Sequence, residues 1–199
     1  METASKTSKC VLLLLFKDFS ATHTVTSLAK QLKLSRVGMW KILRKLEIEK
    51  YINLKSVGSG KTSTAIVKLN LENSILEKTI SLYLTEESDK QRRWQINFVE
   101  LERMTDFVIL YGSILHSPRE SNDIDIIAIN KKKNFVNIQK IIDKVQKTQV
   151  RKIHAINFTE SEFKLELKKS NRAFIDAVRK GVILFGQDNF VRFMTEIVQ

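Results

Sequence analysis

The sequence predicts an α+β protein with two domains that are joined by helices. Three observations lead to this prediction. The first 70 residues combine helical patterns with a short hairpin pattern and carry most of the positive charge. The stretch Val108–Asn130 has the pattern of strand, turn, loop and strand. Only six glycines and one proline occur in 199 residues, which argues against long flexible linkers. We place the domain boundaries at 1–70, 71–105 and 106–199.

The first expected helix runs from Ser8 to about Phe19. It contains the apolar run Cys10–Phe16, which is too short to span a membrane and has no small-residue cleavage site after it. We therefore expect a buried helix and no membrane association. Cys10 is the single cysteine, so an intramolecular disulfide is excluded, and a cytoplasmic location is expected.

Two further helices and a hairpin are expected next. Thr24–Leu32 has apolar residues at i, i+3, i+4 and i+7. Ser35 is a good N-cap for a helix from Arg36 to about Leu46. Strands are expected at Tyr51–Lys55 and Thr64–Leu69, around a glycine-containing tip. In the third helix, we expect these residues to face the core or its edge: Val37, Ile42 and Leu46 inward, with Leu43 or Trp40 at the edge.

This order of elements resembles a winged helix-turn-helix DNA-binding domain over about residues 8–70. The stretch Thr24–Ile52 carries the resemblance, with a helix, a leucine-centred turn, a serine-capped helix and a strand. The resemblance implies that the third helix is the recognition helix, whose early residues meet base edges while basic residues grip phosphates. Arg36 and Trp40 are then candidates for base contacts. The candidates for backbone contacts are Lys41, Arg44, Lys45, Lys55 and Lys61.

The distribution of charge favours double-stranded DNA as a partner. Residues 1–70 contain 13 basic and 4 acidic residues, a net charge of +9, out of +12 for the whole chain. Two other interpretations stay open. The lysines could form an ordinary solvated helix face, or the domain could dock a protein. Trp40 could anchor such a partner or pack in the core.

The segment 71–105 should form helices. Asn73 or Ser74 could cap a helix that reaches Leu84, and Thr85–Ser88 has the pattern of a break before a second helix from Glu87 to Met104. Both helices are too apolar to be free linkers. They could pack between the domains or against a second chain, which leaves a homodimer open.

The stretch Val108–Asn130 carries the strongest chemical pattern. Asp123 and Asp125 lie two apart on an expected strand, so they point to one face and need a compensating cation such as Mg²⁺. Upstream, Gly112 lacks a side chain and would let a phosphate approach its backbone, and Ser113 would add a hydroxyl. These residues predict a site for a metal-bound nucleoside triphosphate.

Gly112-Ser113, a gap of nine residues and Asp123-x-Asp125 resemble the signature of the polymerase-beta-type nucleotidyltransferase superfamily. The chain is similar in particular to minimal nucleotidyltransferases of archaea and bacteria, over roughly 106–190. The resemblance implies that the glycine and serine contact the triphosphate and that the two aspartates hold Mg²⁺ and are catalytic. Some small members are antitoxins that modify a partner toxin, which makes a protein partner a further option.

Active members of that superfamily usually carry a third carboxylate on a later strand. The corresponding strand here is expected at Val150–Phe158 and contains no acidic residue. His154, or less favourably Asn157, would take the position. We expect His154 to be a partly buried strand residue, although a histidine could also bind a metal.

The other elements of the second half follow from capping and periodicity. Thr159-Glu160-Ser161-Glu162 has the form of a capping box, and Gly181 ends a helix. The expected elements are helices at 135–148, 160–168, 171–180 and 188–198 and a strand at 182–185.

Two functions are therefore weighed. The first is a DNA-binding regulator whose second domain binds Mg-nucleotide with weak or lost catalysis. The second is an active Mg²⁺-dependent nucleotidyltransferase that transfers NMP from an NTP to a protein, nucleic acid or small molecule. Dependence of transfer on Asp123 would distinguish the second from the first.

Overall fold

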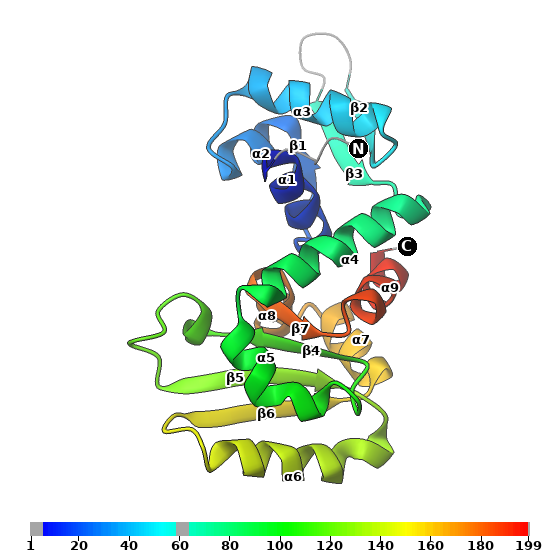
Figure 1. Cartoon of the computed structure of the whole chain (residues 1–199). Coiled ribbons are helices and arrows are strands. Elements are labelled where there is room, and N and C mark those ends of the chain that lie inside the picture. The colour runs from blue at the N-terminus through cyan, green and yellow to red at the C-terminus, as the bar shows by residue number, and fades with distance from the viewer. Residues whose placement is uncertain (1–5, 59–63, 199) are drawn as a thin grey trace. The chain divides into compact units, whose positions relative to one another are not determined.

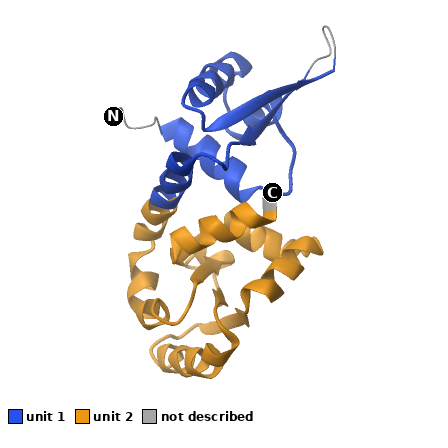
Figure 2. Ribbon diagram, turned by 90° about the vertical axis from the view of Figure 1, so that its right-hand side faces the viewer, with its two compact units in different colours: residues 1–83 blue, residues 84–199 orange. Residues whose placement is uncertain are grey.

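The structure is a computed structural model and describes residues 6–58 and 64–198 (Figure 1). It has helices and two separate sheets, so the expected α+β class is confirmed. The chain divides into two compact units, residues 1–83 and 84–199 (Figure 2). This division falls inside helix α4 (Ser74–Asp89), within the segment that the sequence marks as helical.

Among the described residues, the first unit contains three helices before α4, the first part of α4 and a small antiparallel sheet. The sheet has the order β1-β3-β2, and its hairpin is in register from Ile52 opposite Leu69 to Val57 opposite Thr64. Strand β1 has only two residues and was not expected. The elements before α4 are α1 (Lys6–Lys17), β1 (His23–Thr24), α2 (Val25–Gln31), α3 (Arg36–Ile48), β2 (Ile52–Val57) and β3 (Thr64–Leu69).

Local capping fixes where the helices of this unit begin. The Thr24 hydroxyl accepts a hydrogen bond from the Ser27 backbone N–H, and the Ser35 hydroxyl accepts one from the Gly38 N–H. Helix α1 is buried along the apolar run, as expected, while Cys10 is exposed.

The inward face of α3 differs from the expected one. Met39, Leu43 and Leu46 are fully buried, whereas Val37 is 67% exposed and Ile42 is only half-buried. The helix has apolar residues on two adjacent faces, and either face would fit the helical period of 3.6 residues as the buried one. In the structure, the face with Met39 is the buried one, and Val37 therefore lies on the surface.

The second unit is built on a four-stranded mixed sheet with the order β6-β5-β4-β7 (Figure 1). Strand β4 is antiparallel to both neighbours, and β5 is parallel to β6. Its elements after α4 are α5 (Arg92–Phe98), β4 (Phe107–Tyr111), β5 (Asp123–Ile129), α6 (Phe135–Gln146), β6 (Lys152–Phe158), α7 (Glu160–Lys168), α8 (Arg172–Lys180), β7 (Val182–Phe185) and α9 (Gln187–Val198).

The expected break at Thr85–Ser88 is wrong, because α4 continues to Asp89 and the chain turns only before Arg92. Ser88 is fully buried inside the helix, where its hydroxyl donates to the Leu184 carbonyl oxygen at 2.9 Å. This tertiary bond satisfies a polar residue that would otherwise favour a helix end.

Each face of the large sheet has its own core. Ile124 and Ile126 point to the face that packs against Trp94 and Phe98 of α5 and the apolar side of α6. The opposite face carries Phe107, whose ring lies 5.3 Å from those of Phe190 and Phe193 in α9. The start of β5 on that second face bears Asp123 and Asp125, which are only partly buried. The sheet thus holds two carboxylates where its cover of helices ends.

No helix among residues 6–58 and 64–198 is both long and apolar enough to cross a membrane.

Candidate functional site

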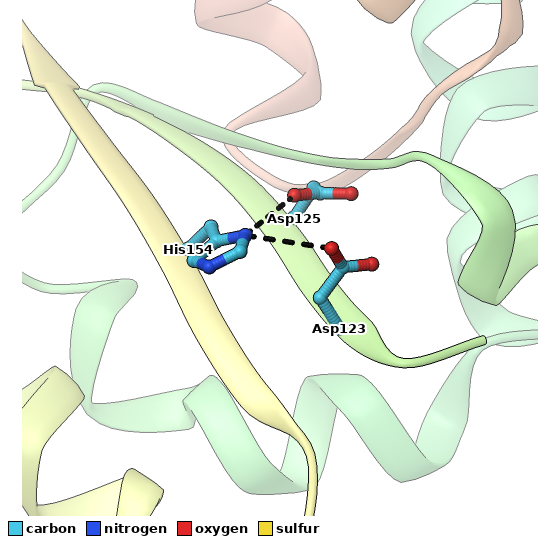
Figure 3. Close-up of side chains that lie close together, drawn as sticks. All are labelled: Asp123, Asp125 and His154. Carbon is cyan, nitrogen blue, oxygen red and sulfur yellow. Dashed lines mark ion pairs between the residues drawn. The ribbon is translucent and has the colours of Figure 1, made fainter.

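Three side chains from two neighbouring strands meet on one face of the sheet (Figure 3). Asp123 and Asp125 share this face because successive residues of β5 alternate between faces. Ile124, between them, is fully buried on the other side. This alternation confirms the expected common direction of the two carboxylates.

His154 of β6 completes the cluster. It lies directly opposite Asp125 in the parallel register. Its Nδ1 is 3.5 Å from one oxygen of Asp123 and 3.5 Å from one oxygen of Asp125. The His154 side chain is 46% exposed, which agrees with the expected partly buried strand residue, and its place beside the two carboxylates also fits a metal ligand. Asn157, the other candidate, lies opposite Ala128 and so belongs to the far face.

Gly112 is required at the end of β4 for two reasons. Its φ of +84° and ψ of −166° lie in a region that is essentially restricted to glycine. A Cβ placed there would lie 2.3 Å from Oδ2 of Asp125. The backbone at Gly112 therefore passes directly beside the carboxylate, as a close approach to a shared ligand would require.

The electrostatics of the site disfavour negative charge. Burial, and then the charge of Asp123, raise the pKa of Asp125, while His154 lowers it in part. Tyr111 lies opposite Asp125 on β4, and burial and the two carboxylates raise the pKa of its phenol. Both shifts describe a site in which an added cation would be stabilised.

A hydrogen-bonded loop holds the carboxylate strand in place. The Ser113 hydroxyl donates to the Ser121 hydroxyl at 3.0 Å, and the latter donates to the backbone oxygen of Asp123 at 2.7 Å. Arg151 Nε donates to the Ser121 carbonyl at 2.7 Å, and this side chain also donates to the Pro118 carbonyl. Ser113 is exposed, and its hydroxyl hydrogen already takes part in a bond within the loop.

Asp123, Asp125 and His154 could hold a metal ion. One ligand atom from each lies within 4.8 Å of the other two. Two carboxylates and one imidazole are chemically suited to a divalent cation, and their partial exposure leaves room for water or a ligand on the ion. This triad is the best-defined chemical constellation in the part of the chain that the structure describes.

The expected DNA-contacting residues lie on and beside α3 in the first unit. Arg36, Lys41, Arg44 and Lys45 are exposed, as is Lys55 on β2. Lys61 lies outside the described residues. Arg44 is engaged locally, since it is 2.7 Å from Glu47 and its guanidinium lies 5.2 Å from the centre of the Trp40 ring.

Trp40 is half-buried between two surface hollows. One, of about 240 Å³, is lined by Arg36 and Trp40 of α3 and by Ser56 and Thr64 of the hairpin. The other is a shallow depression along the outer side of α3, which ends at Ile48, a residue 81% exposed. The helix therefore offers apolar as well as basic surface.

The sequence did not point to three residues that lie around Asp123, Asp125 and His154. They are Tyr111, Ser121 and Arg151. Strand alternation relates Tyr111 only to Ile109 on its own strand, and the register of the structure is needed to place it opposite Asp125. Ser121 and Arg151 act through backbone carbonyls in an irregular loop, and no sequence pattern marks such bonds.

Comparison with known proteins adds no relative, since no family model, no curated protein and no solved structure matches the chain.

Proposed function

We propose that this chain is a DNA-binding regulator whose second unit is nucleotidyltransferase-like, binding a metal–nucleotide complex with weak or lost catalysis. The observation that carries the proposal is the cluster of Asp123, Asp125 and His154 beside the close backbone of Gly112. A cation held there would offset the negative charge of a triphosphate. Mg²⁺ is the ion that the resemblance implies.

The residues of the site have distinct roles in this proposal. Asp123 and Asp125 hold the ion, and Gly112 lets a phosphate approach the backbone. Ser113 offers its hydroxyl oxygen as a further polar contact. The third position of the constellation is an imidazole, which brings no negative charge to help activate an attacking hydroxyl. Weak or lost transfer is the expected consequence.

Titration calorimetry with ATP and GTP tests the nucleotide site, in Mg²⁺ and separately in Mn²⁺. We expect binding that requires the ion and that is lost in Asp123→Asn/Asp125→Asn. The control is Asp143→Asn/Glu160→Gln, which removes two exposed carboxylates of the same unit. Binding of neither nucleotide with either ion to the wild type would refute the nucleotide site.

An active nucleotidyltransferase is the second candidate. The two carboxylates on one face favour it, because an ion between them could position a triphosphate for transfer of NMP. Incubation with α-³²P-labelled nucleotides and candidate proteins, nucleic acids or small molecules measures this. Transfer of the label that requires Asp123 would favour an active enzyme over a domain that has lost catalysis.

The DNA-binding part of the proposal is supported by the exposed basic residues of α3 and β2. We expect the full chain to bind duplex DNA and Arg36→Ala/Arg44→Ala to bind it at least about tenfold more weakly. Lys132→Ala/Lys133→Ala removes the same charge from the second unit and serves as the control. Equal losses in the two variants would indicate a general charge effect. Wild-type binding that is absent or insensitive to salt would favour a protein-docking role for Trp40 and Ile48.

A further inference from the structure

The candidate metal ligands of the second unit include a nitrogen atom, that of His154, and a nitrogen ligand affects which ion the site would prefer. Mg²⁺ prefers oxygen ligands and keeps several waters, whereas imidazole suits Zn²⁺ and neighbouring transition ions. Among divalent first-row ions, affinity at a nitrogen- and oxygen-containing site rises from Mn²⁺ through Co²⁺, and Zn²⁺ lies above Mn²⁺. We propose that Asp123, Asp125 and His154 form a three-ligand site that binds Zn²⁺ or Co²⁺ in preference to Mg²⁺.

The distances from the imidazole nitrogen to the two carboxylates are closer to the ligand spacing of a tetrahedral ion than to that of an octahedral ion. Nδ1 of His154 lies 3.5 Å from the nearest oxygen of each aspartate. Ligand atoms of a tetrahedral Zn²⁺ site with bonds of about 2.0–2.1 Å lie about 3.3 Å apart. Adjacent ligands of an octahedral Mg²⁺ site lie about 3.0 Å apart. At these two spacings, His154 therefore needs a smaller adjustment for a tetrahedral ion than for an octahedral one.

The position of His154 is set by the backbone of the sheet. Its parallel register with Asp125 places the ring on the face of both carboxylates. The Ser121 hydroxyl fixes the strand by donating to the backbone oxygen of Asp123. Three protein ligands with partly exposed side chains leave a fourth position for water or a ligand oxygen, as in open zinc sites.

Another role for His154 has to be distinguished. A protonated imidazole between two carboxylates could itself supply the compensating positive charge, and no metal would then be needed. The two roles differ in one measurable property. A ligand changes which ion binds, whereas a counter-charge opposes the binding of every cation.

The experiment compares the metal-stripped full chain with Zn²⁺, Co²⁺ and Mg²⁺ by equilibrium dialysis and by Co²⁺ absorption. All proteins carry Cys10→Ser, because that exposed thiol is itself a ligand for Zn²⁺. We expect one Zn²⁺ per chain, bound at least about a hundredfold more tightly than Mg²⁺, and visible Co²⁺ bands. His154→Ala should weaken Zn²⁺ binding at least about tenfold and abolish the Co²⁺ bands.

Two variants make the test specific. His154→Asp supplies a third carboxylate, so we expect weaker Zn²⁺ and stronger Mg²⁺ binding. His116→Ala removes the other histidine of the second unit, which lies outside the cluster, and should change neither affinity. Thermal melting of each variant without metal shows whether it folds. Equal affinity for Zn²⁺ and Mg²⁺, or unaltered Zn²⁺ binding in folded His154→Ala, would overturn the inference.

The inference concerns the site of the proposed function but does not depend on a nucleotide. Zn²⁺ binding without any nucleotide binding would leave the inference standing and refute the proposed nucleotide site. Mg²⁺-dependent nucleotide binding that is indifferent to His154 would do the reverse. Absence of all metal binding would reject the metal site.

Discussion

At the scale of single residues, the site depends on the missing side chain of Gly112. Its backbone conformation alone would cost a non-glycine residue about 1–3 kcal/mol. An added Cβ would also displace the Asp125 carboxylate, whose Oδ2 would lie 2.3 Å away. We expect Gly112→Ala to lower the free energy of unfolding by about 1–3 kcal/mol and to weaken metal binding at least about tenfold.

Gly186 provides the matched control for this prediction. It has a φ of +74°, and an added Cβ would lie 2.0 Å from the Asp106 carbonyl oxygen, in a turn of the same unit. Gly186→Ala should destabilise the protein but leave the metal affinity of the folded fraction unchanged. Urea unfolding and metal titration measure the two quantities. Equal effects of both variants on metal affinity would mean that Gly112 acts only through stability.

The charged form of Asp125 is expected to lower the stability of the folded protein when no cation is bound. Burial and the neighbouring Asp123 raise its pKa, so the folded state disfavours the ionised form relative to the unfolded state. Asp125→Asn removes this charge at similar size. We therefore expect a higher melting temperature at pH 7 without metal, together with loss of metal binding. Ile126→Val, a buried control beside it, should lower the melting temperature. A melting temperature that falls in metal-free Asp125→Asn would contradict this argument.

At the scale of elements, α7 begins with a capping box that the sequence predicts and the structure confirms. The Thr159 hydroxyl accepts from the Glu162 N–H, and Glu162 accepts from the Thr159 N–H at 2.8 Å. Loss of this cap in Thr159→Ala should cost about 1 kcal/mol. These bonds lower the pKa of Glu162 below its ordinary value of 4.5, so its contribution is present above that value and is lost as the pH falls through the folded pKa.

Glu162→Gln tests this pH dependence, because glutamine keeps an acceptor but no charge. We expect the wild type to exceed Glu162→Gln in melting temperature by a constant amount above pH 5.5, and the difference to shrink below the ordinary pKa of 4.5. Glu160→Gln removes the same charge from the same helical turn and is the control. A difference between wild type and Glu162→Gln that grows on acidification would contradict the capping argument.

Elements also show which signals the sequence contains. Local signals were sufficient for the capping box, for the alternation of Asp123 and Asp125 and for the end of α8 before Gly181. The inward face of α3 was not predictable, because apolar residues occur on two faces and only the neighbouring elements select one.

The same distinction applies to the metal cluster. The candidate position of His154 followed from counting along β6, but its equal distance from both carboxylates depends on the parallel register of β5 and β6. The uninterrupted α4 contains a bond from Ser88 to Leu184, residues that are 96 positions apart. Contacts of this kind lie outside any local pattern.

At the scale of the whole molecule, most of the positive charge and the candidate metal ligands lie in different parts of the chain. Residues 1–70 carry a net charge of +9. The remaining residues carry +3 and include Asp123, Asp125 and His154, which could hold a metal ion. A polyanion is therefore expected to bind mainly through the basic residues of the first unit. Substitutions in one unit at a time therefore test DNA binding and metal binding of the full chain.

The salt dependence of DNA binding gives the sharpest test of this division. Each phosphate contact contributes about 0.9 to the slope of log K against log salt concentration. If Lys41 on the exposed face of α3 contacts a phosphate, Lys41→Ala should reduce the magnitude of the slope by about 1 and weaken binding to all sequences alike. Arg36→Ala, at a proposed base contact, should weaken binding to a selected DNA site more than binding to random DNA.

Fluorescence anisotropy between 50 and 300 mM KCl measures these slopes, and Lys132→Ala in the second unit is the control of equal charge. Its slope should match the wild type, because its charge lies outside the first unit. If Lys41→Ala and Lys132→Ala change the slope equally, the DNA is held by the net charge of the chain rather than by α3. A wild-type slope near zero would contradict the proposed phosphate contacts of α3 and would favour the alternative of a protein-docking surface that includes the exposed Val37 and Ile48.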